Sequence, residues 1–360
     1  MDQFIAGEHA LEVLVHEVME APWVAIDTEF LRTRTFHPKL CLLQVATPSG
    51  VYCVDPLALE IDPLLAALEG PAQKIGHALR QDLEIFHQRR GRLPTPLADT
   101  QIAAVLLGYD GQTGYATLVQ AELGVTLDKR HTRTDWSRRP LSEEQLHYAG
   151  NDVRHLPLLH ERLKSRLVER GRLGWFEEEC ARLLSAAHYE DGAGAAAARF
   201  PHAHRLPPEA QAALWALIRW REETARRIDR PRRWVIDDDV LTRIATMRPV
   251  RAQQLHGVRG FAPQAMRFAE GLLEALAGAS AYSGTPFWEP PAPLTDDERN
   301  RFDALAALIQ KKAQALGIVT SVLATRRDLE SAARGLPGSL DSGWRHALLS
   351  PEIDAVMAVR

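Results

Sequence analysis

Three short apolar runs near the amino terminus constrain the fold more than any other feature. They are WVAID at 23–27, LCLLQVA at 40–46 and VYCVD at 51–55, and turn residues such as Pro38 and Pro56 bound them. Runs of this length, rich in β-branched and aromatic residues, are typical of strands. Because the linkers between successive runs are short, they predict an antiparallel meander at the start of a sheet.

Helices alternate with a further short strand after this meander. A long helical pattern begins at Ser142, where Gln145 stands at the capping-box position, and runs to about Arg170 with a bend or break at Pro157. The alternation predicts a mixed sheet with helices packed around it, an α/β arrangement. The predicted helices before Ser142 are 63–69, 78–89, 100–107 and 115–123, and the predicted strand is 74–77.

The second half of the chain has a different composition. Gly, Ala and Pro crowd together at 188–208 and again at 278–294, which predicts linkers. From residue 209 onward every strong periodic signal is helical. The carboxy-terminal half is therefore predicted to hold two small all-α units in tandem.

Composition excludes several classes of protein. The 360 residues suggest two or three domains, and 46% hydrophobic with 25% charged residues excludes global disorder. No apolar run approaches the ~20 residues of a membrane span, and the first residues lack the basic region of a signal peptide. Three cysteines without CxxC spacing fit a reduced cytoplasm, so we expect a cytoplasmic location. With a net charge of −4, any polyanion site must come from local clusters.

The segment IDTEF at 26–30 places two carboxylates together. Because strand side chains alternate, Asp27 and Glu29 share one face while Thr28 points to the other. Two close anions raise at least one pKa unless cations lie between them. Taken alone the pattern is weak, since a strand end that reaches solvent explains it equally well.

Two helical segments add further acids. Asp82 lies on the polar side of the helix at 78–89, where by itself it is an ordinary surface acid. In HYAGND at 147–152, Tyr148 and Asp152 stand at i and i+4 and share one helix face. His147 stands five residues before Asp152, which turns it off that face, so we expect it at the surface.

Together, Asp27, Glu29, Asp82, Asp152 and Tyr148 match in order the three-motif signature of the DEDD exonucleases, and the YxxxD spacing selects the tyrosine branch. The stretches DTEFLRTRTFHPKLCLLQVAT, LADTQIAA and LDKRHTRTDWSRRPLSEEQLHYAGND resemble the ribonuclease D family. The helical units resemble the helicase-and-RNase-D C-terminal (HRDC) domains that follow that catalytic domain.

The resemblance implies a domain organisation. It comprises a ribonuclease H-like exonuclease domain at 1–190, a linker at 191–206, an HRDC domain at 207–287, a linker at 288–294 and a diverged HRDC-like domain at 295–360. The implied activity is a 3′→5′ exoribonuclease that releases nucleoside 5′-monophosphates and processes tRNA 3′ ends. The implied partner is RNA, with tRNA precursors carrying 3′ trailers as substrates; we expect a monomer and neither a membrane nor a nucleotide cofactor.

Hydrolysis of a phosphodiester brings a nucleophile to a phosphate that is already negative. Two divalent cations, Mg²⁺ or Mn²⁺, can orient that attack and stabilise the leaving oxygen, and carboxylates are the ligands they prefer. The resemblance places Asp27, Glu29 and Asp152 around one metal, with Asp27 bridging to a second that Asp82 supports. Tyr148 would orient the attacking water, because the ordinary pKa of a tyrosine, about 10, makes it a poor base.

Two basic stretches are candidates for RNA contact. One is KRHTRTDWSRR at 129–139, in which we expect Trp136 to be a core residue; the other is RWREETARRIDRPRRW at 219–234, which an acidic run follows directly. Phe30 can stack on a terminal base or pack in the core, and we expect His77 and Asp99 to support the site. The candidate RNA contacts are Phe30, His77, Lys129, Arg130, Arg133, Arg138, Arg139, Arg226, Arg227, Arg230, Arg232 and Arg233.

Two alternatives stay open. A DNA 3′→5′ exonuclease would use the same carboxylates, since nothing in the motifs reads the 2′-hydroxyl group. A non-catalytic RNA-binding protein on an exonuclease fold is the alternative from another class. Such a protein would be expected to have lost carboxylates, whereas all four and the tyrosine are present.

Overall fold

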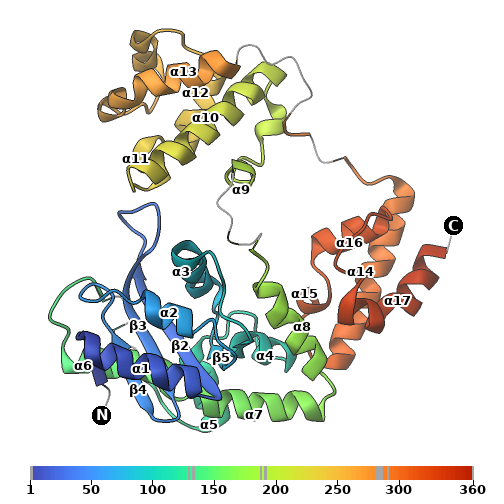
Figure 1. Ribbon diagram of the computed structural model, residues 1–360. Coiled ribbons are helices and arrows are strands. Elements are labelled where there is room, and N and C mark those ends of the chain that lie inside the picture. The colour runs from blue at the N-terminus through green and yellow to red at the C-terminus, as the bar shows by residue number, and fades with distance from the viewer. Residues whose placement is uncertain are drawn as a thin grey trace. The chain divides into compact units, whose positions relative to one another are not determined.

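The chain divides into two compact units in the computed structural model (Figure 1). The first comprises Met1–Phe30, Leu40–Tyr189 and Pro293–Arg360, and the second comprises Leu31–Lys39 and Glu190–Ala292. The structure describes residues 3–128, 130–131, 134–186, 189, 193–279, 287–289 and 292–358.

A six-stranded mixed sheet forms the centre of the first unit, in the order β1-β4-β3-β2-β5-β6. The three apolar runs are strands, as predicted, and β3 pairs with β4 in antiparallel fashion. The pairs β1–β4, β2–β5 and β5–β6 are parallel, which makes the sheet mixed. The strands are β1 (Gln3–Ile5), β2 (Trp23–Leu31), β3 (Lys39–Thr47), β4 (Gly50–Val54), β5 (Gln73–Gly76) and β6 (Leu97–Asp99).

Strand β2 contributes to two separate hydrophobic cores because its side chains alternate. Val24 and Ile26 pack in one core with α1 (Glu8–Glu20), α2 (Asp62–Ala67) and α3 (Arg80–Arg90). Ala25 packs in the other, and the helices that share that core are α4 (Thr100–Leu106), α5 (Tyr115–Leu123), α6 (Glu143–Arg154), α7 (Leu156–Glu169) and α8 (Leu173–Leu183). The carboxyl end of β2 therefore receives side chains from helices of both cores.

The long helix predicted from Ser142 is two helices. Ser142 and Gln145 form the predicted capping box at the start of α6, with Gln145 N donating to Ser142 Oγ at 3.2 Å. His155 separates α6 from α7, and Pro157 lies in the first turn of α7, where a missing N–H costs nothing. The break predicted near Pro157 is confirmed.

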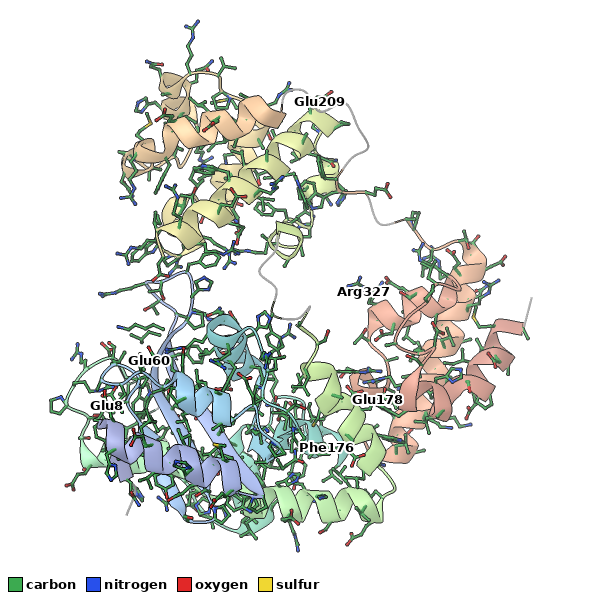
Figure 2. The ribbon with its side chains drawn as sticks, in the orientation of Figure 1. Glu8, Glu60, Phe176, Glu178, Glu209 and Arg327 are labelled. Atoms are coloured by element: carbon green, nitrogen blue, oxygen red, sulfur yellow. The ribbon has the colours of Figure 1, made fainter. Side chains whose placement is uncertain are left out.

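The carboxy-terminal helices α14 (Asp296–Leu316), α15 (Thr320–Leu323), α16 (Arg326–Ala333) and α17 (Gly343–Ala358) belong to this first unit. Leu305 and Ile309 of α14 share one hydrophobic core with Leu106 and Leu118 of the exonuclease region. Phe176, on the same helix as Glu178 (Figure 2), is buried in that core as well. The helices at 296–358 are thus continuous with the exonuclease core, which composition alone did not reveal.

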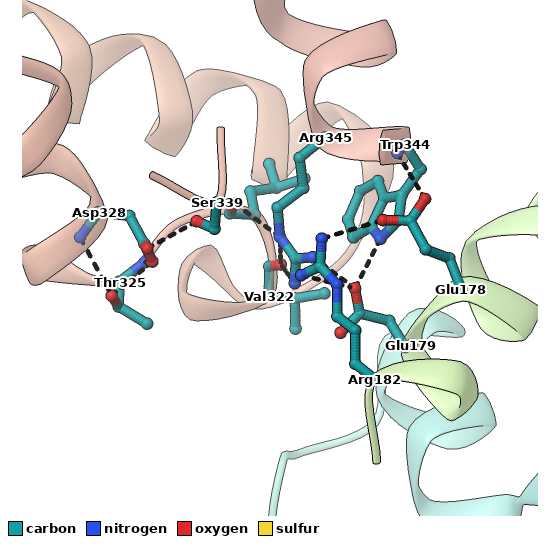
Figure 3. Close-up of polar contacts among 10 residues, drawn as sticks. Glu178, Glu179, Arg182, Val322, Thr325, Asp328, Ser339, Trp344 and Arg345 are labelled. Atoms are coloured by element: carbon teal, nitrogen blue, oxygen red, sulfur yellow. Dashed lines mark hydrogen bonds and ion pairs between the residues drawn. The ribbon is translucent and has the colours of Figure 1, made fainter. Parts of the chain in front are cut away.

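Polar contacts between α8 and α17 reinforce this shared core (Figure 3). The backbone N–H of Trp344 donates to Glu178 Oε2 at 2.8 Å, and its indole Nε1 donates to Glu179 Oε1 at 2.7 Å. Arg345 pairs with the same Glu179 carboxylate. The rings of Trp175 and Trp344 stack with centroids 4.4 Å apart. A stack of this kind, in which Trp344 is buried and hydrogen-bonded, fixes the two helices against each other.

The second unit is helical. Its α-helices are α9 (Ala193–Ala197), α10 (Pro208–Arg227), α11 (Arg232–Val235), α12 (Asp238–Met247) and α13 (Ala269–Ala279). Two 3₁₀ helices, η3 (Ala252–Gly257) and η4 (Pro263–Phe268), lie between α12 and α13. Much of the predicted linker at 191–206 is structured, because Ala196, Ala197 and Phe200 are buried in this unit's core.

No helix in the described part of the chain has the length and apolar character needed to cross a bilayer. Cys41, Cys53 and Cys180 are buried, and none of the three is in a disulfide.

Candidate active site

Two carboxylates stand at the carboxyl end of β2, the central strand that both cores share. Asp27 and Glu29 are half-buried, and they alternate with Thr28, which is buried on the opposite face. The sequence predicted this alternation from the strand period alone.

The two remaining acids come from helices in different parts of the unit. Asp82 lies in the first turn of α3 and is buried, with 6% of its surface exposed, which corrects its interpretation as an ordinary surface acid. The hydroxyl of Thr28 donates to Asp82 Oδ1 and so links α3 to β2. Asp152 lies on α6 and is half-buried.

The pKa shifts of these acids have a common cause. Burial, together with the charges of Asp27, Asp152 and Asp82, raises the pKa of Glu29 to about 9. Burial and the charge of Asp152 raise the pKa of Asp27, and burial and the charge of Asp27 raise that of Asp82. Burial raises the pKa of Asp152 to about 7. Each carboxylate therefore lies within electrostatic reach of at least one of the others.

No Lys or Arg side chain in the described part of the chain pairs with these acids. Buried carboxylates that lack a basic partner are the ones that coordinate metal ions or take up protons. The donor set of four carboxylates suits a hard divalent cation such as Mg²⁺ or Mn²⁺.

The four acids lie near one another but do not form a complete set of metal ligands. Among the residues that the structure describes, no three His, Cys, Asp or Glu side chains are drawn together closely enough to cage an ion. Like charges repel at short range, so carboxylates approach one another closely only around a cation. The chemistry of the donor set, rather than a preformed cage, is what fits a metal here.

Tyr148 stands one helical turn before Asp152 on α6 and is half-buried. Its ring stacks on Trp136 with centroids 6.2 Å apart, and His131 contacts it edge-on at 5.7 Å. Trp136 is buried, with 3% exposure, as predicted for a core residue. His147 is exposed, as the helix geometry predicted.

Tyr115 is a residue that the sequence did not single out. Burial and the charges of Asp152 and Asp27 raise its pKa, so its hydroxyl lies near two of the acids. That hydroxyl donates to the backbone oxygen of Asn151 at 3.1 Å, next to Asp152. No motif contains Tyr115, and only the packing of α5 against α6 and α7 could have revealed it.

His77 and Asp99 support the backbone around the site. His77 Nδ1 lies 3.0 Å from Thr100 Oγ1, and Nε2 lies 3.2 Å from the oxygen of Thr113. The Asp99 carboxylate accepts from the backbone N–H groups of Ala78, Leu79 and Gln101. Both His77 ring nitrogens are thus engaged within the protein rather than presented to a ligand.

The first basic stretch is only partly described, because Lys129 and Arg133 lie outside the described residues. Arg130 pairs with Asp128 at 2.6 Å, and Arg138 pairs with Asp135 at 3.3 Å. Both arginines are exposed, so these pairs are weak and leave the cations accessible to a phosphate.

Arg139 has an intramolecular role instead. Its guanidinium binds Asp55 in bidentate fashion, with Nε–Oδ2 and Nη2–Oδ1 both 2.6 Å. It also donates to the backbone oxygens of Cys41, Trp136 and Arg138. Burial alone would raise the pKa of Asp55, but the hydrogen bonds from Arg139 hold it below its ordinary value. Arg139 therefore joins the segment before α6 to the sheet, with no donor left for RNA.

We expect Arg139→Ala to lower the free energy of unfolding by about 3–5 kcal/mol, because it strands a buried carboxylate. Arg139→Lys should recover part of this loss but not the bidentate geometry. Folding lowers the pKa of Asp55. The stability that its ion pair contributes is therefore fully present above about pH 4, and it is lost as the pH falls through the pKa of the folded state. Urea unfolding at neutral pH measures the effect, and an unchanged midpoint for Arg139→Ala would contradict it.

The second basic stretch lies in the second unit. The guanidinium of Arg232 lies 4.4 Å from the ring centroid of Phe36, and that of Arg226 lies 5.3 Å from it. Arg230 donates to the backbone oxygen of Arg34 at 3.2 Å. These three arginines hold the segment 31–39 of the same unit.

Arg227 and Arg233 are exposed and have no hydrogen-bond or ion-pair partner within the described residues. Of the five arginines of this stretch that are candidate RNA contacts, these two are therefore free for a ligand. Phe30 is half-buried and packs against the core that contains Val24 and Ile26. One side of its ring therefore contacts the core.

Comparison with known proteins defines the class. Residues 3–168 match the 3′–5′ exonuclease family, and residues 210–276 match the HRDC domain family. The fold and the acidic site thus define a 3′–5′ exonuclease with an attached HRDC domain.

Relatives that match along the whole chain define the family. The ribonuclease D of Xanthomonas oryzae pv. oryzae is 38% identical over 92% of both chains, and that of Granulibacter bethesdensis is 37% identical over 95% of this chain and 89% of its own. The crystal structure of Escherichia coli RNase D superposes with a TM-score of 0.89 at 32% identity, covering 99% of this chain and 98% of that one. The chain belongs to the ribonuclease D family and is an exoribonuclease.

Proposed function

We propose that this chain hydrolyses RNA one nucleotide at a time from the 3′ end and releases nucleoside 5′-monophosphates, using two divalent cations. The observation that carries this proposal is the group of four mutually repelling carboxylates at the end of β2, none of which has a Lys or Arg partner within the described residues. Such a group suits the binding of Mg²⁺ or Mn²⁺ beside a negatively charged phosphodiester.

Each acid has a distinct place in this proposal. Asp27, Glu29 and Asp152 would hold one cation, and Asp27 with Asp82 would hold the second. When bound, the cations would neutralise charge on the phosphate and make water more acidic. Thr28 would orient the Asp82 carboxylate through its hydroxyl. By holding the cations, the carboxylates would fix where a negatively charged phosphate can bind, beside the carboxyl end of β2.

Tyr148 would position the attacking water by a hydrogen bond. Trp136 and His131 contact its ring and limit its rotation, which keeps the hydroxyl in place. Positioning rather than proton abstraction is therefore its expected contribution.

We expect Tyr148→Phe to lower kcat by about 10²-fold, as for a reactant that is no longer correctly positioned, with little change in RNA affinity. His147→Ala is the matched control, because His147 precedes Tyr148 on the same helix and is exposed. The kcat of this variant should equal that of the parent chain. Single-turnover hydrolysis of a labelled oligonucleotide measures both. A loss in His147→Ala as large as that in Tyr148→Phe would assign the role to the histidine.

The proposed cellular task is the trimming of tRNA 3′ ends. The E. coli relative is described as an exoribonuclease involved in structured RNA processing, and the HRDC-like region would help to hold such an RNA. A cytoplasmic location and a monomeric state stay predictions, as do the domain boundaries given above.

A 5′-labelled tRNA precursor, incubated with Mg²⁺, Mn²⁺ or a chelator and resolved at single-nucleotide length, tests the proposal. We expect stepwise shortening from the 3′ end that stops near the mature terminus and is absent with the chelator. A matched DNA oligonucleotide with the same 3′ sequence should be degraded more slowly. Equal rates would favour the DNA exonuclease, and no shortening under any condition would favour the non-catalytic alternative.

A further inference from the structure

A cavity in the second unit is lined by exposed aromatic and basic side chains. It has a volume of about 380 Å³, within the range of small-molecule sites, and Arg233, Trp234, Phe261, Gln264 and Arg267 are among its lining residues. Trp234 is 46% exposed, whereas the other seven tryptophans, all in the described part of the chain, are buried or half-buried. An indole left open at the wall of a cavity offers a flat apolar face to a ligand.

The charged side chains of this cavity favour an anion. Arg233 and Arg267 line it, and Arg233 has no ion pair or hydrogen bond within the described residues. The single lining carboxylate is Asp237, which accepts from the backbone N–H of Asp239 at 3.1 Å as the cap of α12. The cavity thus carries more positive than negative charge, and its one acid already has a structural contact.

Two other cavities of the same unit lack this character. One, of about 470 Å³ between α10 and α13, is lined by Glu223 and Glu274 against the lone cation Arg219. In the other, of about 350 Å³, the lining arginines are already paired; the pairs are Arg199–Asp238 at 2.8 Å and Arg243–Asp239 at 3.8 Å. Among these three cavities, charge therefore favours the one beside Trp234 for a polyanion.

We propose that this cavity, named here the Trp234 pocket, binds an unpaired nucleobase of the RNA substrate. The base would stack on the Trp234 indole, and Arg233 and Arg267 would contact the flanking phosphates. Gln264 supplies an amide that can hydrogen-bond the edge of a base. The proposal deepens the proposed function and rests on it, because it takes RNA as the ligand.

The pocket also narrows the set of arginines expected to contact RNA. Arg226 and Arg232 lie over the Phe36 ring, and Arg232 also pairs with Glu222 at 2.6 Å. Arg233, the next residue after Arg232, is free and lines the pocket. Arg267, which no sequence motif contains, joins it there.

Fluorescence anisotropy with a single-stranded RNA of about 12 nucleotides tests the proposal. The full chain carrying Asp27→Asn serves as the background, so that binding is measured without hydrolysis. Trp234→Ala should weaken binding by at least about fivefold, the low end of what one base stack contributes, while Trp234→Phe should stay within about twofold. Arg233→Ala should make the plot of log association constant against log salt concentration less steep, by about 1 in slope.

Arg219→Ala is the control, because it removes an exposed arginine of the same unit that lines a different cavity. It should bind RNA as the background does, and thermal unfolding should show that Trp234→Ala keeps the fold, since its side chain is exposed. Unchanged RNA affinity in Trp234→Ala, or an equal loss of affinity in Arg219→Ala, would contradict the proposal that the Trp234 pocket binds a base. Hydrolysis of the same RNA by the parent chain is measured separately; if the parent chain hydrolyses no RNA, it is the proposed function that fails.

Discussion

Asp27→Asn is expected to abolish hydrolysis while leaving RNA binding measurable. Asp27 is the acid proposed to contact both cations, and its charge contributes to the raised pKa values of Glu29 and Asp82. An amide keeps the shape of the carboxylate but removes the charge that would hold a cation. Loss of several kcal/mol of transition-state stabilisation corresponds to a rate lower by at least about 10³-fold.

Asp303→Asn is the matched control for this variant. Asp303 is an exposed aspartate of α14, so the substitution changes the net charge equally without touching the acidic site. Single-turnover rates on labelled RNA and anisotropy with the same RNA give activity and binding separately. A hydrolysis rate for Asp27→Asn equal to that of Asp303→Asn would contradict the proposed role of Asp27 in binding the cations.

Removal of residues 293–360 is expected to unfold the first unit rather than to trim an accessory domain. Leu305 and Ile309 are fully buried against the exonuclease helices, and Trp344 is buried against Trp175. Loss of one buried tryptophan costs about 3–5 kcal/mol, and a whole domain is stable by only about 5–15 kcal/mol. The truncated chain should therefore lose its cooperative unfolding transition.

Single substitutions separate this effect from the general consequences of truncation. Trp344→Ala should lower the free energy of urea unfolding by about 3–5 kcal/mol. Leu336→Ala, at a position 53% exposed in the same helical region, should change it by less than about 0.5 kcal/mol. A truncated chain that unfolds at the same urea concentration as the full chain would contradict the shared core.

The strand and helix patterns were largely predictable because they depend on local periodicity. Asp27 and Glu29 on one face, the capping box at Ser142 and the break before Pro157 each follow from a few neighbouring residues. The motifs supplied the other members of the acidic site.

Features that depend on packing between distant segments were not predictable from one sequence. The burial of Asp82 follows from its contact with Thr28, 54 positions away, and the role of Arg139 from its contact with Asp55, 84 positions away. The helical period of α14 shows that it has an apolar face but not which surface covers that face. Tyr115 was not predicted for the same reason, because its place near the acids depends on how α5 packs.

Calorimetric titration of the full chain with Mn²⁺ tests the central claim most directly, because it needs neither substrate nor turnover. If the four acids bind cations as proposed, the parent chain takes up two ions and Asp27→Asn takes up fewer and more weakly. Uptake of no ions by the parent chain, or the same uptake by Asp27→Asn, would contradict it.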